Sequence, residues 1–408
     1  MFDAALEGVG PYAKYAYFFV GQSYLAYDWT AGADRGGRAV DHGPRPMSEW
    51  DLPAPFNSGV TGALNGAGPY AGKAYFFRDA QYVEYDWGTG HGAGPYPMSA
   101  WPLPAAYLAG FDDAWSGEGS RAAYGYFLRE LDYVRYRWSS NTLSAGYPKP
   151  FAERRVQGIV GGVDGCVNGR ERYQGKAYFF LGDHYSRLSW DSLFGDSSLL
   201  AVARNWPGLA ELAAVEPARR LAIGWIGIAL ARLAALGNTW PALDPVLGDA
   251  LRTHFHITNS ATAAQHLPTV RFRMQELRDR LLRLEEVLRF RTSEEAVADG
   301  SKPEYPGYTA SDRSLINITQ HYLTNDSFIV HGPRYKAAMI QHESGHQIGM
   351  MVDHAYEHEY AKYAALTVQQ AVENTSSYLM FVQHMESLRD IRFDQNGNQI
   401  PFHILITQ

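Results

Sequence analysis

One motif recurs four times in the first half of the chain and limits the folds open to it. Each copy contains an aromatic strand, a polar turn and a second strand that ends in tryptophan. The copies run from Ala16 to Trp29, Ala74 to Trp87, Gly125 to Trp138 and Ala177 to Trp190. The repeat length is about fifty residues, and one sheet of this size cannot bury both of its faces alone. The four units therefore predict an all-β four-bladed propeller over residues 1–210.

Each unit opens with a short lead-in, and a tryptophan closes three of the units. The lead-ins are Phe2-Asp3-Ala4-Ala5, Phe56-Asn57-Ser58-Gly59, Phe111-Asp112-Asp113-Ala114 and Val163-Asp164-Gly165-Cys166, and the closing tryptophans are Trp50, Trp101 and Trp206. Together with the Ala-Tyr-Phe-Phe strand and the Tyr-Asp ending, this pattern resembles the hemopexin repeat. The resemblance implies a docking module, and some members of the family bind haem or small polyamines.

The same resemblance implies an ion in the central tunnel of the propeller. In the family, backbone carbonyls of the lead-in residues surround this ion, which puts Asp3, Asn57, Asp112 and Asp164 near the tunnel. Their side chains are also suited to capping turns. The repeated tyrosines and tryptophans are expected inside the blades, because they recur at the period of the repeat itself.

The composition changes after Trp206, where alanine, leucine and arginine replace the aromatic repeat. A domain boundary is expected here, followed by a second domain over residues 211–408. Helical periodicity predicts helices over about residues 209–236 and 269–290, and a strand is expected over 314–319. The second domain is therefore expected to be mainly α, within the α+β class.

A later helix of this domain carries a His-Glu-x-x-His motif, formed by His342, Glu343 and His346. Histidines four residues apart lie on one helical face, so both imidazoles can bind one tetrahedral ion. Glu343 lies on a neighbouring face, where its carboxylate can act on a water without being a ligand. The motif is typical of zinc peptidases. The alternative is a helix with two surface histidines, but apolar residues on both sides of the motif favour a buried helix that lines a cleft.

A catalytic zinc needs a third protein ligand, and three arrangements compete for it. The metzincin pattern requires a histidine where this chain has Val352, so it fails by one residue. The thermolysin-like pattern, Glu-x-x-x-Asp on a later helix, is met by Glu386. The third arrangement fits best: the chain resembles the aspzincins, whose third ligand is an aspartate, and this resemblance implies Asp353; Glu386 is the second choice.

The segment from Asp353 to Tyr356 resembles the aspzincins, the deuterolysin and lysine-specific metalloendopeptidase family. The region from Ala371 to Phe381 is similar to that family's Asn-Ala-Asp-Ser-Tyr-x-x-Phe segment, and the resemblance covers about residues 245–390. It implies a Zn²⁺ ion held by two histidines and an aspartate. Ser376 and Leu379 replace the acidic residues with which the family favours lysine, so a lysine preference is not expected.

These assignments lead to a hypothesis for the mechanism. Zn²⁺ held by His342, His346 and Asp353 activates a water and polarises the scissile carbonyl. Glu343 takes the proton of the water, and Tyr356 donates a hydrogen bond to the tetrahedral oxyanion.

The bulk composition excludes several other classes of function. The net charge of −7 and the pI of about 6.1 argue against a nucleic-acid partner. A single cysteine, Cys166, excludes an intramolecular disulfide. The apolar stretch from Leu221 to Leu236 is interrupted by Arg232 and is too short for a membrane span. The N-terminus has no signal-peptide pattern, so we expect a cytoplasmic protein or one exported by a non-classical route.

The predicted function is a zinc-dependent endopeptidase whose propeller docks a protein or peptide substrate, in the manner of a bacterial effector or toxin. The rival from another class is a hemopexin-like binding protein for haem, a polyamine or a host surface, which carries an inactive peptidase-like domain. The intact Glu343 favours the peptidase.

Overall fold

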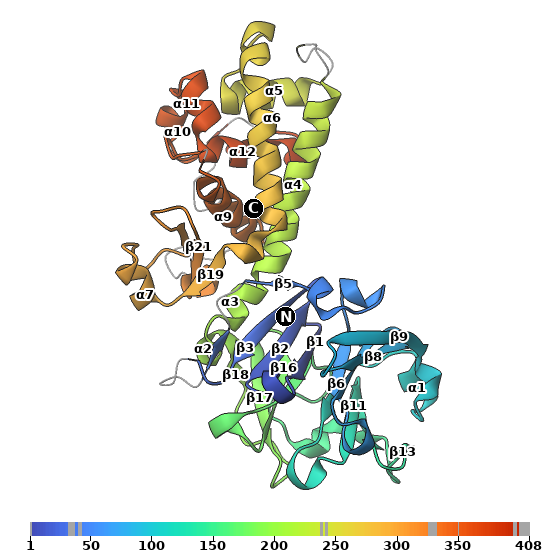
Figure 1. Cartoon of the computed structure of the whole chain (residues 1–408). Helices are drawn as coiled ribbons and strands as arrows, with labels where there is room; N and C mark the ends of the chain where they lie inside the picture. Colours follow the sequence, from blue (N-terminus) through green and yellow to red (C-terminus); the bar gives the residue numbers. More distant parts are fainter. Residues whose placement is uncertain are drawn as a thin grey trace. The chain divides into compact units, whose positions relative to one another are not determined.

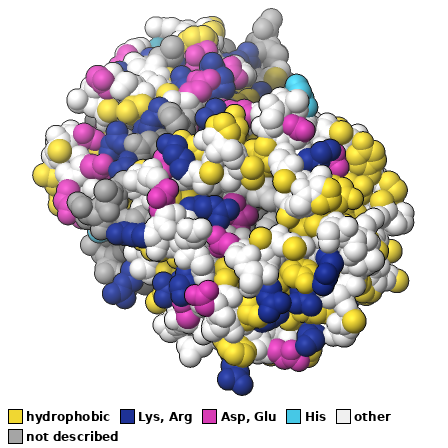
Figure 2. All heavy atoms as spheres, turned by 60° about the horizontal axis from the view of Figure 1, so that its bottom comes forward, with side chains coloured by type: hydrophobic (Ala, Val, Ile, Leu, Met, Phe, Trp, Pro, Cys, Tyr) yellow, Lys and Arg dark blue, Asp and Glu magenta, His cyan; other side chains and the backbone are white. Residues whose placement is uncertain are grey.

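The computed structural model describes residues 2–31, 37–39, 43–236, 240, 244–324, 333–349, 351–394 and 398–399. The chain divides into two compact units, Met1–Ala213 and Ala214–Gln408. Figure 1 shows the first unit as a set of small sheets and the second as mainly long helices. On the face drawn in Figure 2, basic and acidic side chains are interspersed. None of the helices in the described residues has the length and apolar character that a membrane span needs.

The described residues of the first unit form four antiparallel sheets, whose main strands pair in chain order. The first sheet contains β1 (Ala4–Glu7), β2 (Tyr15–Val20), β3 (Ser23–Asp28), β4 (Arg38–Ala39) and β5 (Arg45–Pro46). The second contains β6 (Gly62–Asn65), β7 (Lys73–Arg78), β8 (Gln81–Asp86) and β9 (His91–Pro97). The third contains β10 (Asp113–Ser116), β11 (Tyr124–Arg129), β12 (Asp132–Arg137), β13 (Thr142–Leu143) and β14 (Lys149–Pro150). The fourth contains β15 (Gly165–Asn168), β16 (Lys176–Leu181), β17 (His184–Ser189) and β18 (Leu200–Ala201).

The second and third strands of every sheet form the hairpin predicted from the repeat. In β2 the four consecutive residues Ala16, Tyr17, Phe18 and Phe19 are all buried, which requires cover on both faces of the strand. Short helices accompany the sheets: α1 (Ala105–Leu108), α2 (Val202–Asn205) and α3 (Leu209–Ala213).

The first strands of the four sheets neighbour one another in cyclic order. β1 lies beside β6, β6 beside β10, β10 beside β15, and β15 beside β1. Hydrogen bonds between the last residues of these strands follow the same order: Asn65 Nδ2 to the Glu7 carbonyl (2.7 Å), Ser116 Oγ to the Asn65 carbonyl (3.1 Å), Asn168 Nδ2 to the Ser116 carbonyl (2.9 Å), and the Asn168 N–H to the Glu7 carboxylate. A buried polar layer therefore links all four sheets.

Aromatic side chains fill the seams between neighbouring sheets. Trp50 contacts Tyr17 of the first sheet and Phe76 of the second, with ring centroids 4.9 and 5.3 Å away. In the other seams Trp101 contacts Tyr75 and Phe127, Phe151 contacts Trp115 and Phe179, and Trp206 contacts Phe180 and Phe18. The residue that closes the third unit is thus Phe151, where the other units have tryptophan.

The lead-in residues expected near a tunnel occupy equivalent positions in three of the four sheets. The carboxylates of Asp3, Asp112 and Asp164 each accept the backbone N–H of the turn that follows the second strand, at 2.5 to 2.6 Å. Asn57 does not share this place: it lies exposed in a short 3₁₀ segment. Thr61 takes the equivalent position, since its N–H bonds to the Phe77 carbonyl as that of Asp3 bonds to Phe19. The alignment of Asn57 was therefore wrong by four residues, because the Phe-Asn pair imitates the Phe-Asp pair of other units.

Where the structure describes it, the second unit consists of helices around one small sheet. Its helices are α4 (Val215–Ala235), α5 (Pro245–Phe255), α6 (Ser260–Leu282), α7 (Ser293–Ala298), α8 (His321–Thr324), α9 (Pro333–Gln347), α10 (Tyr360–Ala364), α11 (Val368–Glu373) and α12 (Thr375–Ser387). The sheet has the order β19 (Leu288–Arg291), β21 (Ile316–Thr319), β20 (Gly307–Thr309), with β20 antiparallel to β21 at one edge. α9 packs against α4, α12 and β20, so its motif lies between helices and the edge strand.

Two of the predicted helices differ from those in the structure. The stretch over 209–236 is broken at Ala214 into α3 and α4. The helix expected over 269–290 begins at Ser260, where Asn259 and Thr262 form a capping box, and Pro268 lies inside it. That helix ends at Leu282, and Leu288–Arg291 form the strand β19, so the prediction of helix up to residue 290 was wrong. The buried Leu288 and Phe290 alternate with arginines, which is the period of a strand.

Candidate metal centre

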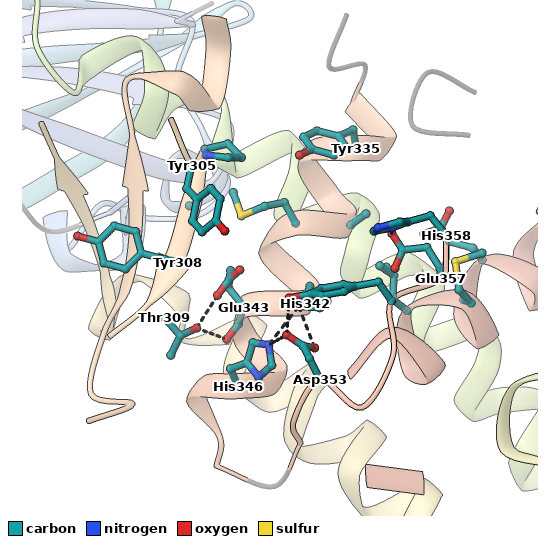
Figure 3. A pocket seen from close by; sticks show the side chains of 18 of the residues that line it. Tyr305, Tyr308, Thr309, Tyr335, His342, Glu343, His346, Asp353, Glu357 and His358 are labelled. Atoms are coloured by element: carbon teal, nitrogen blue, oxygen red, sulfur yellow. Dashed lines mark hydrogen bonds and ion pairs between the residues drawn. The ribbon is translucent and has the colours of Figure 1, made fainter. Parts of the chain in front are cut away.

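The two motif histidines come from the last turns of α9 and converge on one point. His342 and His346 lie one helical turn apart, with their Nε2 atoms 3.1 Å from each other. Their side chains are mostly buried, with exposed fractions of 14% and 19%. Figure 3 shows both imidazoles directed toward the carboxylate of Asp353. The spacing of the motif therefore yields the convergence that the sequence predicts.

Asp353 reaches the histidines from the irregular segment that follows α9. Its Oδ2 lies 3.1 Å from His346 Nε2, and its Oδ1 lies 3.3 Å from His342 Nε2. One ligand atom from each of the three residues thus falls within 4.8 Å of the others. Of the three arrangements weighed from the sequence, this is the one whose side chains the structure brings together.

The donor set fits zinc in both chemistry and spacing. Two imidazoles and one carboxylate are ligands that zinc accepts, and donors about 2.0 to 2.1 Å from a tetrahedral ion lie roughly 3.3 Å apart. The observed separations of 3.1 to 3.3 Å are close to that edge length. The other ring nitrogen of His346, Nδ1, faces the Met351 carbonyl at 3.4 Å, which leaves Nε2 for the ion.

The charges at the site favour a cation. Burial alone would lower the pKa of His342, but its hydrogen bond to Asp353 and the charges of Glu343 and Asp353 raise it to about 9. Burial would raise the pKa of the Asp353 carboxyl, yet the hydrogen bonds from His342 and His346 hold it far below its usual range. Asp353 is therefore ionised, and a proton on His342 competes with any metal ion.

Glu343 lies beside the three metal-ligand candidates, His342, His346 and Asp353, but does not belong to that group. The hydroxyl of Thr309, at the end of β20, lies 2.7 Å from Glu343 Oε2 and 2.9 Å from the Glu343 carbonyl. The edge strand of the sheet thereby fixes the carboxylate at the cavity wall (Figure 3). The position suits a group that takes a proton from a water at the site.

Tyr356 belongs to the same irregular segment as Asp353. Its ring stacks between His342 and His358, with centroids 6.0 and 5.5 Å away. Burial and the charge of Asp353 raise the pKa of its hydroxyl, so the group stays protonated and can donate.

A cavity of about 700 Å³ opens beside these residues, in the size range of ligand pockets. Its wall is largely apolar and aromatic and includes Tyr305, Tyr335, Ala338, Met339, Leu379 and Met380. Leu379, one of the positions where the family has an acid, lines the cavity. The other, Ser376, donates its hydroxyl to Glu357 Oε2 at 2.9 Å.

Glu357 is a cavity residue that the sequence analysis did not select. Burial would raise the pKa of its carboxyl, but hydrogen bonds from His358 and Ser376 lower it, so the group is charged. It directly follows Tyr356, at the position where the resembled family has glycine. A glutamate in place of that glycine was the sequence signal that could have identified Glu357 as a residue of the site.

Glu386, the second choice for the third ligand, lies elsewhere. Its carboxylate forms a two-pronged ion pair with Arg334, at 2.8 and 3.2 Å. Arg334 in turn covers the ring of Trp225, 5.1 Å from its centroid. Glu386 is thus used in helix packing, and the structure does not bring it to the histidines.

Comparisons with known proteins give partial likenesses. No family model matches the chain, and no curated protein matches its sequence. Among solved structures, it is similar to LS24, a seed albumin from Lathyrus sativus, at 18% identity and a TM-score of 0.44, over 52% of this chain and 97% of that one. The hemopexin fold protein CP4 from cow pea gives 20% identity and a TM-score of 0.44, over 51% and 96% of the two chains. A zinc peptidase from Grifola frondosa gives 18% identity and a TM-score of 0.32, over 44% and 98%. The structural neighbours therefore include hemopexin-fold seed albumins and a zinc peptidase, each matching about half of the chain.

Proposed function

We propose that this chain is a zinc-dependent endopeptidase in which His342, His346 and Asp353 hold the ion. The observation that carries this proposal is the separation of 3.1 to 3.3 Å between their donor atoms, at the wall of a cavity of about 700 Å³. Such a donor set leaves a fourth position open, which a hydrolytic zinc site requires.

When bound, zinc would act as a Lewis acid and lower the pKa of a water to about 7. Glu343 is the general base in this scheme. Its carboxylate, oriented by the Thr309 hydroxyl, takes the proton of the attacking water and later gives it to the leaving amine. The Tyr356 hydroxyl, which donates to Asp353 in the resting structure, turns in this scheme to donate its hydrogen bond to the oxygen of the scissile carbonyl as negative charge develops there.

A peptide substrate suits the edge of the small sheet. All three residues of β20 line the cavity, and within the described part of the chain β20 pairs with β21 alone. An extended peptide can add to such an edge through backbone hydrogen bonds, while the cavity takes a side chain. An open strand edge beside the cavity can hold an extended stretch of peptide, and this supports cleavage inside a peptide chain and not only at its end.

For the N-terminal unit we propose a four-bladed propeller that docks the substrate or its carrier. The cyclic order of β1, β6, β10 and β15 and the hydrogen bonds that follow it support this arrangement. An ion on the axis stays a prediction, with Thr61 taking the place of Asn57 beside Asp3, Asp112 and Asp164.

The test measures zinc and activity separately. Wild type should bind about one zinc per chain, and His346→Ala should lose it, as elemental analysis would detect. Glu343→Gln should keep the zinc and lose cleavage of a casein or peptide-library substrate by about 10² to 10⁴-fold. If wild type and Glu343→Gln both hold zinc and neither cleaves, the chain is a binding protein with an inactive domain.

A further inference from the structure

Asn374 sits at the start of α12, yet its side chain does not cap that helix. The residue has the extended backbone typical of an N-cap, with φ −87° and ψ 122°, but its side-chain oxygen accepts no backbone N–H of α12, and the contact of its amide with that helix is a bond from Nδ2 to the Ser377 hydroxyl at 3.2 Å. Asparagine is among the preferred N-cap residues because its oxygen accepts the free N–H groups there. Here the amide is fully buried, and its oxygen is used outside the helix.

The amide binds instead to the backbone of the segment that carries Asp353 and Tyr356. Its Oδ1 accepts the N–H of His354 at 2.9 Å and the N–H of Ala355 at 3.0 Å. Its Nδ2 donates to the Ala355 carbonyl at 2.9 Å. The two residues that Asn374 holds are the two that separate Asp353 from Tyr356 in the sequence.

Backbone bonds on either side of Asn374 reinforce the same contact. The N–H of Val352 bonds to the Glu373 carbonyl at 2.9 Å, and the N–H of Thr375 bonds to the Val352 carbonyl at 3.0 Å. The segment from 351 to 359 has no helix or strand of its own. Its path is therefore set by the junction between α11 and α12.

We propose that Asn374 is the positioning residue of the metal centre, which holds Asp353 and Tyr356 in place toward His342 and His346. The proposal rests on the proposed function. The role requires an acceptor and a donor on one planar group, which asparagine has. Aspartate at this position would keep the acceptor for the two N–H groups and lose the donor, and alanine would lose both.

The test compares Asn374→Ala and Asn374→Asp with a matched control, Asn317→Ala. Asn317 is equally buried in the same unit, but it belongs to β21 and is outside the segment of Asp353. The first readout is amide hydrogen exchange of residues 352–357 in protein stripped of metal with a chelator. We expect exchange at least about tenfold faster in Asn374→Ala, an intermediate change in Asn374→Asp and none in the control.

The second readout is the zinc affinity, measured by competition with a chelating dye. Partners that orient metal ligands typically contribute 10 to 100-fold, so we expect Asn374→Ala to bind zinc about 10 to 100 times more weakly and Asn374→Asp less so. In zinc-saturated protein, kcat should fall while KM for the peptide stays within about twofold, because the part of the cavity wall formed by β20, α9 and α12 is unchanged.

The outcomes separate this proposal from the proposed function. If the wild type takes up no zinc at its two histidines, the peptidase proposal fails, and the exchange experiment still decides whether Asn374 holds the segment. If Asn374→Ala melts at a lower temperature but keeps the exchange rates of 352–357 and the zinc affinity of wild type, Asn374 is a general packing residue and the inference is overturned.

Discussion

The hydroxyl of Tyr356 donates a hydrogen bond to Asp353 Oδ2 at 3.0 Å, across only two intervening residues. The same ring lies nearly parallel to the imidazole of His342, at an angle of 18°. One side chain thus contacts two of the three donors and also faces the cavity. A tyrosine in this place links the geometry of the metal centre to the substrate side of the site.

Replacing Tyr356 with phenylalanine should therefore separate two effects. We expect kcat to fall about 10² to 10³-fold, the usual loss when one oxyanion donor is removed. Zinc affinity should fall by about tenfold or less, because Asp353 loses one hydrogen bond. Steady-state kinetics and a zinc competition titration would measure both. Tyr305→Phe, another tyrosine of the cavity wall, is the control; an equal loss of kcat in the two variants would argue against a specific role for Tyr356.

The hydroxyl of Thr309 should matter through Glu343. Thr309→Val removes the bond of 2.7 Å to Oε2 but keeps the shape of the side chain. We expect kcat to fall about tenfold with zinc content unchanged, because the base loses its orientation. Thr309→Ser restores the hydroxyl and should recover most of the rate. A valine variant as active as wild type would contradict this link.

The affinity for zinc should depend on pH through His342. Its pKa is about 9, raised by Asp353 above the ordinary 6.5, so the imidazole carries a proton at pH 7 that zinc must displace. The affinity should therefore rise about tenfold per pH unit from 6.5 to 8.5 and level off above about 9. Competition titrations across this range would show the slope, and calorimetry in buffers of different ionisation enthalpy should count about one proton released per zinc at pH 7. An affinity that does not change with pH would refute the prediction.

Glu357 should affect which side chain the cavity accepts. The carboxylate is charged and mostly buried; it accepts a hydrogen bond from Ser376 and lies 3.8 Å from His358 Nδ1. We expect Glu357→Gln to lower kcat/KM for a peptide with a positive side chain about tenfold relative to the same peptide with methionine. Leu379→Met, a neutral change in the same wall, should leave the ratio unchanged. Equal ratios in wild type and Glu357→Gln would show that this charge does not select the substrate.

The repeats gave the local structure of the first unit correctly, since hairpins depend on neighbouring residues. Every predicted hairpin is present because alternating aromatic residues and polar turns act at short range. The error at Asn57 has a different cause. The equivalent place is defined by a backbone hydrogen bond, which Thr61 makes as well as an aspartate does, so the side chain carries no reliable mark of it.

In the second unit, the motif on α9 could be predicted and its surroundings could not. His342 and His346 converge because four residues make one turn, a relation within one helix. Three other interactions join segments that are distant in the sequence, so no local sequence pattern predicts them. They are the hydrogen bonds of Asn374 to His354 and Ala355, the contact of Thr309 with Glu343, and the ion pair of Glu386 with Arg334. The strand β19 was missed because its alternating period covers only four residues, and its parallel pairing with β21 joins segments that are distant in the sequence.

The junction at Asn374 has a consequence for the order of events during synthesis. Helix α9 with its two histidines leaves the ribosome before residues 373–375, to which the segment of Asp353 is bound. Until that later stretch has emerged and α12 has packed, the nascent chain has two ligands and no fixed third one. The proposed hydrolytic site would thus be complete only after nearly all of the described second unit has been made, so a partly made chain should have no cleavage activity.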